Sequence, residues 1–290
     1  MPPQYCAPKK FGKGDTCLTR KELLLIAHDY NNSISNPKKK IGLSLSKKRL
    51  YNVIRERLSD TCDDEYCFIE QGFVADEHKR ELESSFRPKK PREWYKNKRT
   101  WLNTFDILHV MKQYEALHKN FTFYGVFPMD FQKNYPSSTQ CIGSSLCTFH
   151  ISDLFKRKKE QFAFVLNLDH HNQSGSHWVS VYGNLNPNKN NFGIYYYDSV
   201  SNEPTKEVRQ FFTQVATQVK EYFQENISKK FTIKFNTVQK QFKNTECGVF
   251  SMVFITQMLK YIDFDYICKF MKKDDQMNDI RDVLYRPNKI

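Results

Sequence analysis

Several features are scarce or missing in this sequence. Ten glycines in 290 residues are about 3%, under half of the usual share of about 7%. A run of about 18 apolar residues, the length that a membrane-spanning helix needs, does not occur, so a membrane span is excluded. The N-terminal residues Met1 to Cys6 lack the apolar region of a secretory signal, so secretion by that route is not expected. No internal repeat stands out.

Acidic residues are few beside the basic ones. The 32 Asp and Glu against 45 Lys and Arg leave a formal net charge of +13. Such a surplus indicates either contact with nucleic acid or another polyanion, or only that many charged lysines keep the surface solvated by water. An apolar share of 39% with 15% aromatic residues is enough to build a core, which excludes a wholly disordered chain.

The cysteines predict free thiols rather than a disulfide framework. In a chain of this length without a signal peptide, cysteines are mostly reduced. Zinc is the less favoured alternative, because no pair shows the close Cys-x-x-Cys spacing of a structural site. We therefore expect mostly buried, reduced thiols among the eight cysteines, which are Cys6, Cys17, Cys62, Cys67, Cys141, Cys147, Cys247 and Cys268.

The first third of the chain is predicted to be mostly helical. Thr19 to Glu22 form a capping-box pattern that opens an apolar run. A second helix is expected over about residues 45–58, with its apolar residues on one face. Residues 87–100 contain two prolines and seven basic residues. This composition predicts an exposed linker, and contact with nucleic acid is a second interpretation.

From Trp101 onward, helical and strand patterns alternate. Asparagines and a proline separate two of the expected strands, as in a hairpin connection. The last expected helix is apolar on nearly every side, which predicts that it is buried in the centre of the domain. Helices are expected over 102–117, from about 204 to 219 and over 248–262, and strands over 162–168, 178–182, 192–197 and 231–238.

Cys247 lies directly before the buried helix. The positive end of a helix dipole and its unpaired N–H groups stabilise a thiolate, which is the nucleophilic form of cysteine. Gly248 is expected to let the backbone turn tightly and to admit a substrate closely. One cysteine beside one glycine is usually structural, so the prediction of a nucleophile depends on residues upstream.

Those residues are His177, Asp198 and Gln241. His177 begins one expected strand and Asp198 ends the next, so a hairpin would bring them together at one end of a sheet. There the carboxylate can orient the imidazole, and the imidazole can take the thiol proton. Gln241, six residues before Cys247, is placed to donate its amide to a developing oxyanion beside the backbone N–H of Cys247.

This order of residues resembles the cysteine proteases of the SUMO-protease and adenovirus-maturation-protease superfamily. There, His-Trp, then Asp or Asn, then Gln and Cys-Gly follow one another along the chain. The gaps of 21 residues between His177 and Asp198 and of 49 between Asp198 and Cys247 are typical of that superfamily. The likeness is greatest to the polyprotein proteases of large DNA viruses, of the African swine fever virus type. It covers the chain from Trp101 well and the N-terminal third weakly.

The resemblance implies an α+β fold. Its centre would be a papain-like, circularly permuted cysteine protease core with a mixed sheet flanked by helices, preceded by a mostly helical N-terminal arm. We accordingly assign residues 1–86 to the arm, 87–100 to a basic linker and 101–290 to the catalytic core.

The resemblance also implies peptide hydrolysis through a thioester. Cys247 would be the nucleophile, His177 the general base that later protonates the leaving amine, and Asp198 the residue that orients it. Gln241 would help to form the oxyanion hole. Trp178 would cover a narrow channel for small residues, since substrates of the family are often cut at or near Gly-Gly, although Trp178 equally suits an ordinary core aromatic.

No cofactor and no metal are expected. His170 and His171 suggest a metal site at first sight, but with Asp169 and Gln173 they are better explained as a polar flank of the catalytic loop. The expected partners are a viral polyprotein or a ubiquitin-like protein as substrate, and nucleic acid at the basic N-terminal region. The expected location is the virion and the viral factory in the host cytoplasm.

Three alternatives to a maturation protease for viral core or capsid polyproteins remain open. The first is a SUMO- or ubiquitin-like deconjugating protease, which the catalytic residues cannot distinguish. The second is an acetyltransferase with the same triad, which Asp198 disfavours because those enzymes usually have Glu there. The third, from another class, is a basic nucleic-acid-binding virion protein with a vestigial triad.

Overall fold

A computed structural model of the protein describes residues 5–10, 14–224 and 229–287. The chain forms two compact units, one within Met1–Lys90 and Asp282–Ile290 and the other within Pro91–Arg281. The last residues therefore group with the N-terminal helices, whereas the sequence analysis placed them with the core. The division into arm, linker and core stays a prediction. Within the described ranges, the helices are too short or too polar to cross a bilayer.

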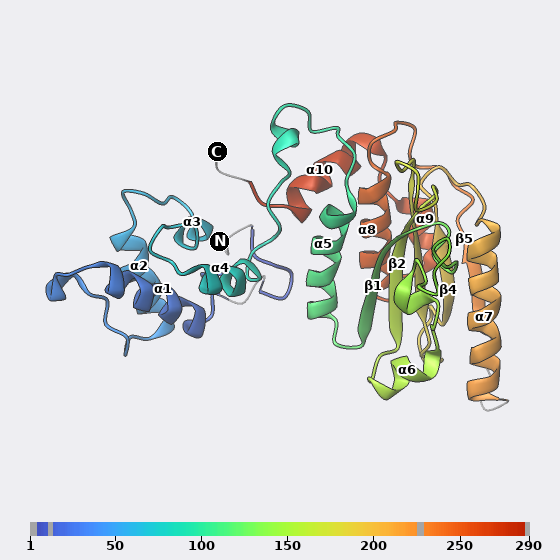
Figure 1. Cartoon of the computed structure of the whole chain (residues 1–290), viewed down its shortest axis with the longest axis horizontal. Helices are drawn as coiled ribbons and strands as arrows, with labels where there is room; N and C mark the ends of the chain where they lie inside the picture. The colour runs from blue at the N-terminus through green and yellow to red at the C-terminus, as the bar shows by residue number, and fades with distance from the viewer. Residues whose placement is uncertain (1–4, 11–13, 225–228, 288–290) are drawn as a thin grey trace. The chain divides into compact units, whose positions relative to one another are not determined.

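The N-terminal unit is a small helical assembly with its own apolar core (Figure 1). The capping box at Thr19 and Glu22 is present, with each side chain accepting a hydrogen bond from the backbone of the other residue. The helix expected over 45–58 is also present, slightly shorter. The elements are α1 (Arg20–Ser33), the 3-10 turn η1 (Pro37–Lys39), α2 (Lys47–Arg57), α3 (Glu65–Phe68) and α4 (Asp76–Glu83).

The returning C-terminal segment is held in this unit by Arg286. Its side chain is 2% exposed and lies over the ring of Tyr66, with the guanidinium carbon 4.9 Å from the ring centroid. One guanidinium nitrogen is 3.4 Å from a carboxylate oxygen of Glu70. The Arg286 backbone N–H also donates to the carbonyl of Pro88, at 2.8 Å. A buried arginine with these partners explains why the segment belongs to the N-terminal unit.

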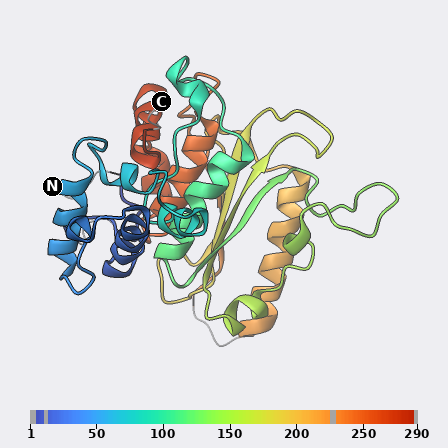
Figure 2. The same cartoon turned by 60° about the vertical axis from the view of Figure 1, so that its left-hand side comes forward.

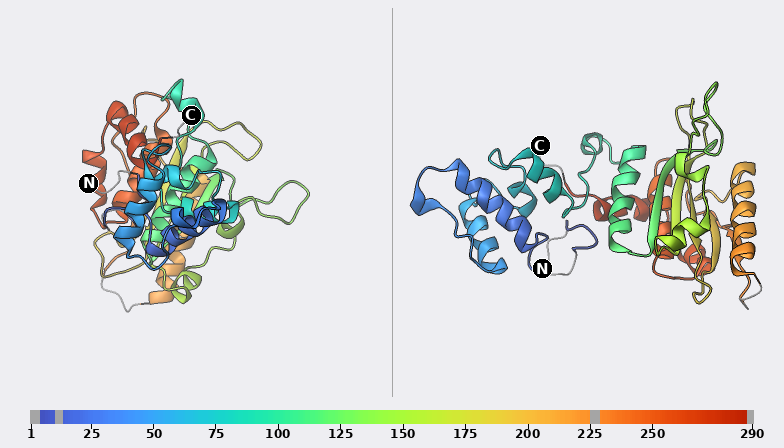
Figure 3. Two further views of the ribbon diagram at one scale, coloured as in Figure 1. Left: turned by 90° about the vertical axis from the view of Figure 1, so that its left-hand side faces the viewer. Right: turned by 60° about the horizontal axis from the view of Figure 1, so that its bottom comes forward.

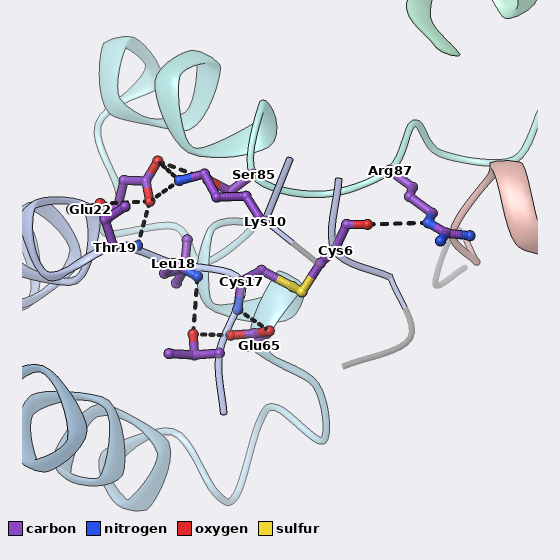
Figure 4. Close-up of a disulfide and its surroundings, with 10 residues drawn as sticks. Cys6, Lys10, Cys17, Leu18, Thr19, Glu22, Glu65, Ser85 and Arg87 are labelled. Carbon is purple, nitrogen blue, oxygen red and sulfur yellow. Dashed lines mark hydrogen bonds and ion pairs between the residues drawn. A yellow bond between two sulfur atoms is a disulfide. The ribbon is translucent and has the colours of Figure 1, made fainter. Parts of the chain in front are cut away.

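The expectation of reduced thiols is wrong for three pairs of cysteines. Cys6 is bonded to Cys17 (Figure 4), Cys62 to Cys67, and Cys141 to Cys147, while Cys247 and Cys268 are free. Each pair is separated by only 11, 5 or 6 residues, so local turns bring the sulfurs together. The sequence argument relied on chain length and on the lack of a signal peptide, and neither reports on such local geometry.

The Cys6–Cys17 disulfide lies beside a buried carboxylate (Figure 4). Glu65 accepts a hydrogen bond from the backbone N–H of Cys17, at 2.9 Å, and another from the Thr16 hydroxyl. Burial is the main cause that raises the pKa of Glu65. Within the described ranges, the two sulfurs and a carboxylate oxygen of Glu65 lie within 4.8 Å of one another, as the ligand atoms of a metal site would. The two sulfurs, however, are bonded to each other.

The second unit is built on a five-stranded mixed sheet with strand order β1-β2-β3-β4-β5. β3 runs antiparallel to both of its neighbours, β2 and β4, while β1 runs parallel to β2 and β5 runs parallel to β4. The expected hairpin of β3 and β4 is confirmed, but the first strand was missed. The strands are β1 (Phe121–Pro128), β2 (Gln161–Asn167), β3 (Trp178–Asn184), β4 (Gly193–Tyr197) and β5 (Thr232–Phe235).

Helices cover both faces of this sheet (Figures 1 and 3). Alternate side chains of the strands face opposite layers. Phe164 of β2 meets Phe211 of α7, with ring centroids 5.2 Å apart, and Tyr197 of β4 stacks on Phe254 of α8 at 4.9 Å. One face carries α6 (Ile151–Lys156) and α7 (Lys206–Phe223), and the other carries α5 (Thr104–Leu117), α8 (Cys247–Met258) and α9 (Phe264–Phe270).

The remaining elements of this unit are short or lie at its end. The segment predicted as an exposed linker contains the 3-10 turn η2 (Arg92–Tyr95), and Trp94 within it is buried. A further 3-10 turn, η3, spans Ser144–Leu146, and the last helix, α10, spans Asp274–Leu284. The mixed sheet with flanking helices confirms the expected α+β class.

We predict that the first disulfide stabilises the N-terminal unit. A bond that closes a loop of 11 residues is worth about 3 kcal/mol in the chain-entropy model. Cys6→Ser should therefore lower the melting temperature in non-reducing buffer, and dithiothreitol should lower that of the wild type as well. Cys268→Ser, which removes a free buried thiol, is the control. An unchanged melting temperature in Cys6→Ser, or unlinked Cys6 and Cys17 peptides in mass spectrometry, would contradict the prediction.

Candidate active site

His177 and Asp198 meet at one end of the sheet. The register pairs Ser180 of β3 with Tyr197 of β4, so the start of one strand and the end of the other lie together. The imidazole Nε2 is 2.6 Å from a carboxylate oxygen of Asp198. The Asp198 side chain is fully buried and that of His177 is 15% exposed. The pair therefore has the geometry of an oriented imidazole that substrate can still reach.

Asp198 is itself held in place by the backbone around it. The oxygen that accepts from His177 also accepts the backbone N–H of Val200, at 2.9 Å. Asn236, which follows β5, accepts the Asp198 N–H at 2.8 Å and donates its amide to the Asp198 carbonyl at 2.6 Å. Asn236 was not among the predicted site residues. The only signal for it is a polar residue directly after a strand, which is too common to single it out.

The other partner of His177 is Cys247. Burial by itself lowers the pKa of the imidazole, but hydrogen bonds to Asp198 and Cys247 and the negative charges of both outweigh burial and raise the pKa to about 9. His177 is therefore an imidazolium at neutral pH. A positive ring beside the sulfur stabilises the thiolate, which is the form that attacks a carbonyl.

Cys247 is the first residue of α8, and its side chain is 2% exposed. This position adds the positive end of the helix dipole to the influence of His177. The expected role of Gly248 is wrong, because the residue lies within the helix and makes no turn. A Cβ atom there would lie 3.0 Å from Leu102 and 3.3 Å from Ile107. The glycine therefore lets α8 pack closely against the chain segment that leads into α5.

Gln241 is buried beside the site, and its amide has a defined orientation. Its oxygen accepts the Ser199 hydroxyl at 2.6 Å, and its nitrogen donates to the Lys243 carbonyl at 2.7 Å. The carbonyl can only accept, so the amide nitrogen must face it. The second amide hydrogen is left for another acceptor. Ser199, which we did not expect to be a nucleophile, orients the glutamine.

Trp178 is 8% exposed and donates its indole N–H to the carbonyl of Leu102, at 2.9 Å. It borders a cavity of about 700 Å³ on the side of the sheet end where His177 lies. Trp101, with 47% of its surface exposed, lines the same cavity and was not among the predicted site residues. No local pattern marks it, because its place depends on how the segment before α5 meets β3.

Two loops, one after β1 and one after β2, extend beyond the sheet (Figure 2), and residues of both line this cavity. The loop after β2 contains His171, whose Nδ1 is 2.7 Å from Asp130 in the loop after β1. The Asp130 carboxylate also accepts the backbone N–H of His171, at 3.0 Å. Asp169 accepts hydrogen bonds from Ser176 and Gly175. These contacts describe a polar loop flank, as the sequence indicated.

Comparison with known proteins identifies the class of the protein. Residues 111–288 match the Ulp1 protease family, C-terminal catalytic domain (peptidase C48). The match covers more than half of the chain, so the protein belongs to this family and is a cysteine peptidase. The alternative of a binding protein with a vestigial triad is therefore wrong.

Its relatives come from large DNA viruses. A protein of Acanthamoeba polyphaga mimivirus named as a thiol protease is 29% identical over 303 aligned residues, which cover 97% of this chain and 93% of that protein. The SUMO-1 cysteine protease of African swine fever virus is 23% identical over 252 residues, 83% of this chain and 89% of the viral protein. The crystal structure of an African swine fever virus protease shares the fold, with a TM-score of 0.69 at 19% identity, over 98% of this chain and 96% of that chain.

We predict that the pH dependence of activity reports on His177. Because its pKa is raised to about 9, the imidazolium persists through neutral pH and is lost as the pH rises through that value. The alkaline limb of kcat/KM should lie near pH 9. Asp198→Asn should move it to lower pH by removing a hydrogen bond and a negative charge. Asp130→Asn, at the His171–Asp130 pair, should leave the limb in place. An alkaline limb at the same pH in Asp198→Asn and wild type would contradict its assignment to His177.

Proposed function

We propose that this peptidase cleaves viral core or capsid polyprotein precursors during virion maturation, at or near Gly-Gly sites. The observation that carries the proposal is the convergence of His177, hydrogen-bonded to Asp198 at 2.6 Å, on Cys247 at the start of α8. The viral origin of the relatives supports a viral substrate. We further propose that the enzyme acts in the virion and in the viral factory of the host cytoplasm.

The proposed reaction begins with the thiolate of Cys247. It attacks the scissile carbonyl, and the negative oxygen that forms is stabilised by the backbone N–H of Cys247 and by the remaining amide hydrogen of Gln241. The His177 imidazolium gives its proton to the leaving amine, and a thioester remains. The neutral imidazole then takes a proton from water, which attacks the thioester and frees the new carboxyl end. Asp198 keeps the ring oriented in both steps.

The cavity supports a preference for small residues near the cut. Trp101 and Trp178 both border it, and Trp178 directly follows His177 along the chain. The exposed indole of Trp101 offers an apolar surface to an extended peptide, although His177 and Cys247 are not among the residues that line the cavity. A Gly-Gly segment, which has no side chains, can approach such a ring most closely with its backbone.

A ubiquitin-like substrate is the second candidate. It is favoured by the name of the African swine fever virus relative, a SUMO-1 cysteine protease. Both candidates need the same catalytic groups and an extended tail at the site, so the triad does not separate them. The substrate itself has to be tested.

Nucleic-acid contact through the basic N-terminal region stays a prediction. At least four of the seven basic residues expected to lie in an exposed linker form ion pairs with nearby carboxylates. Lys90, for example, is 2.5 Å from Asp282, and Lys89 is 2.9 Å from Glu70. Lys98 also pairs with Asp279, and Arg99 pairs with Asp275. These pairs reduce the positive charge that the segment offers to a polyanion.

The proposal predicts cleavage that depends on Cys247. Purified protein is incubated with Gly-Gly-X peptides, with core polyprotein precursors and with SUMO conjugates, and the products are identified by mass spectrometry. Wild type should cut the peptides and the precursors at or near Gly-Gly, and Cys247→Ala should lower kcat by at least about a thousandfold. Cys268→Ser is the matched control and should cut normally. Cleavage of SUMO conjugates alone would favour the second candidate, and cleavage that survives Cys247→Ala would overturn the mechanism.

We predict a separate role for Trp101 in substrate binding. Its exposed ring contributes apolar area to the cavity and little to the core, so Trp101→Ala should raise KM by about tenfold, the equivalent of burying roughly 50 Å² of apolar surface. The kcat value and the melting temperature should change little. Phe105→Ala removes another exposed aromatic side chain, 66% exposed, that does not line the cavity, and it should behave as wild type. An unchanged KM in Trp101→Ala would contradict the role.

A further inference from the structure

The chain segment before the nucleophile has little regular structure of its own. Residues 241–246, here called the oxyanion segment, lie between β5 and α8 without forming helix or strand. They carry Gln241 at one end and lead into Cys247 at the other. A segment without ladder hydrogen bonds needs outside partners for its backbone if its groups are to keep one geometry.

Helix α10 supplies partners at the beginning of the segment. Asp274, the first residue of α10, is 5% exposed. Its carboxylate accepts the backbone N–H groups of Phe242, at 2.9 Å, and of Lys243, at 3.1 Å. The Lys243 carbonyl in turn accepts the Gln241 amide at 2.7 Å. The backbone of a single residue, Lys243, therefore links Asp274 to the proposed oxyanion donor.

The same helix supplies partners at the end of the segment. Arg281 donates through Nε to the Glu246 carboxylate and through a terminal nitrogen to the Thr245 carbonyl, both at 2.8 Å. Asn278 donates its amide to the other oxygen of Glu246, also at 2.8 Å. Glu246 and Arg281 are fully buried, and Trp94 covers the guanidinium with its ring centroid 4.6 Å away.

The spacing of these residues places them together. Positions 274, 278 and 281 are separated by four and three residues, so they lie on one face of the helix. The hydrogen bonds from that face reach the oxyanion segment near both of its ends. Glu246 directly precedes Cys247, and an unpaired carboxylate there would disfavour a thiolate. Arg281 offsets that charge inside the protein.

We propose that α10 positions the catalytic groups of the peptidase, with Asp274 and Arg281 as positioning residues. Neither residue lines the cavity. Asp274 holds the backbone of Lys243, whose carbonyl orients the Gln241 amide, and Arg281 fixes and neutralises Glu246 beside the nucleophile. This inference rests on the proposed function, because it assigns both residues to the same reaction.

The test compares two neighbouring aspartates at the start of α10. Asp274→Asn weakens the bonds to the backbone of the oxyanion segment. Asp275→Asn is the matched control, because the hydrogen bonds of Asp275 to described residues go to the side chains of Lys243 and Arg99 and not to the backbone of the segment. Asp274→Asn should lower kcat on a Gly-Gly-X peptide by about tenfold, less than the loss of a whole oxyanion donor, with KM within about twofold of wild type. Asp275→Asn should stay within about twofold in both.

Two further measurements separate positioning from general damage. The rate at which iodoacetamide alkylates Cys247 should be the same in Asp274→Asn and wild type, because the thiolate and His177 are unaffected. In a Gln241→Ala background, Asp274→Asn should cause little further loss, because both changes act through the same amide. Arg281→Lys keeps the charge but loses the forked donor geometry, so it should also lower kcat. Melting curves establish that each variant is folded at the assay temperature.

Some outcomes would overturn only the inference about α10, and others would overturn the proposed function as well. A wild-type kcat in both Asp274→Asn and Arg281→Lys would overturn the inference and leave the proposed function standing. Additive effects of Asp274→Asn and Gln241→Ala, or a fall in alkylation rate that matches the fall in kcat, would also overturn it. If Asp274→Asn does not fold, the kcat of Arg281→Lys decides whether the inference about α10 stands. A wild-type protein that cleaves no substrate would instead contradict the proposed function, and the inference with it.

Discussion

The antiparallel pairing of β3 and β4 is the constraint on which the catalytic arrangement depends. Its register brings the residue before β3, His177, and the residue after β4, Asp198, to one edge of the sheet. The hairpin alone therefore places these two side chains together. β5 runs parallel to β4, and therefore its end lies at the same edge and brings Asn236 to the backbone of Asp198. The start of α8 then needs only to pack against this edge for Cys247 to reach the imidazole.

Buried carboxylates surround the nucleophile, and each has a specific partner. Asp198 is paired with the His177 imidazolium, Glu246 with the Arg281 guanidinium, and Asp274 with two backbone N–H groups. A carboxylate left without such partners in the interior would take up a proton or destabilise the fold. Because all three are matched, the site can hold a thiolate among several acidic groups. Preorganised charge of this kind is the usual main source of rate enhancement in hydrolysis.

The N-terminal unit is stabilised by different means. Its helices are short, and covalent bonds at Cys6–Cys17 and Cys62–Cys67 supplement its apolar core. Small assemblies bury a smaller fraction of their surface, so cross-links contribute a larger part of their stability. Arg286 adds a buried cation against aromatic rings and carboxylates. The second unit has a core built from aromatic contacts across the sheet and contains the remaining disulfide, Cys141–Cys147.

The sequence by itself determined the features that depend on neighbouring residues. The capping box at Thr19, the apolar helix after Cys247 and the hairpin between His177 and Asp198 all follow from local periodicity and turn chemistry, and the order His, Asp, Gln, Cys identified the family. Only the tertiary structure decided that Gly248 packs against Leu102 and that Trp101 borders the cavity. It also decided that Asp274 and Arg281 hold a segment more than 30 residues earlier in the chain. Such contacts depend on how elements pack in space, and no pattern within a single stretch of sequence encodes that packing.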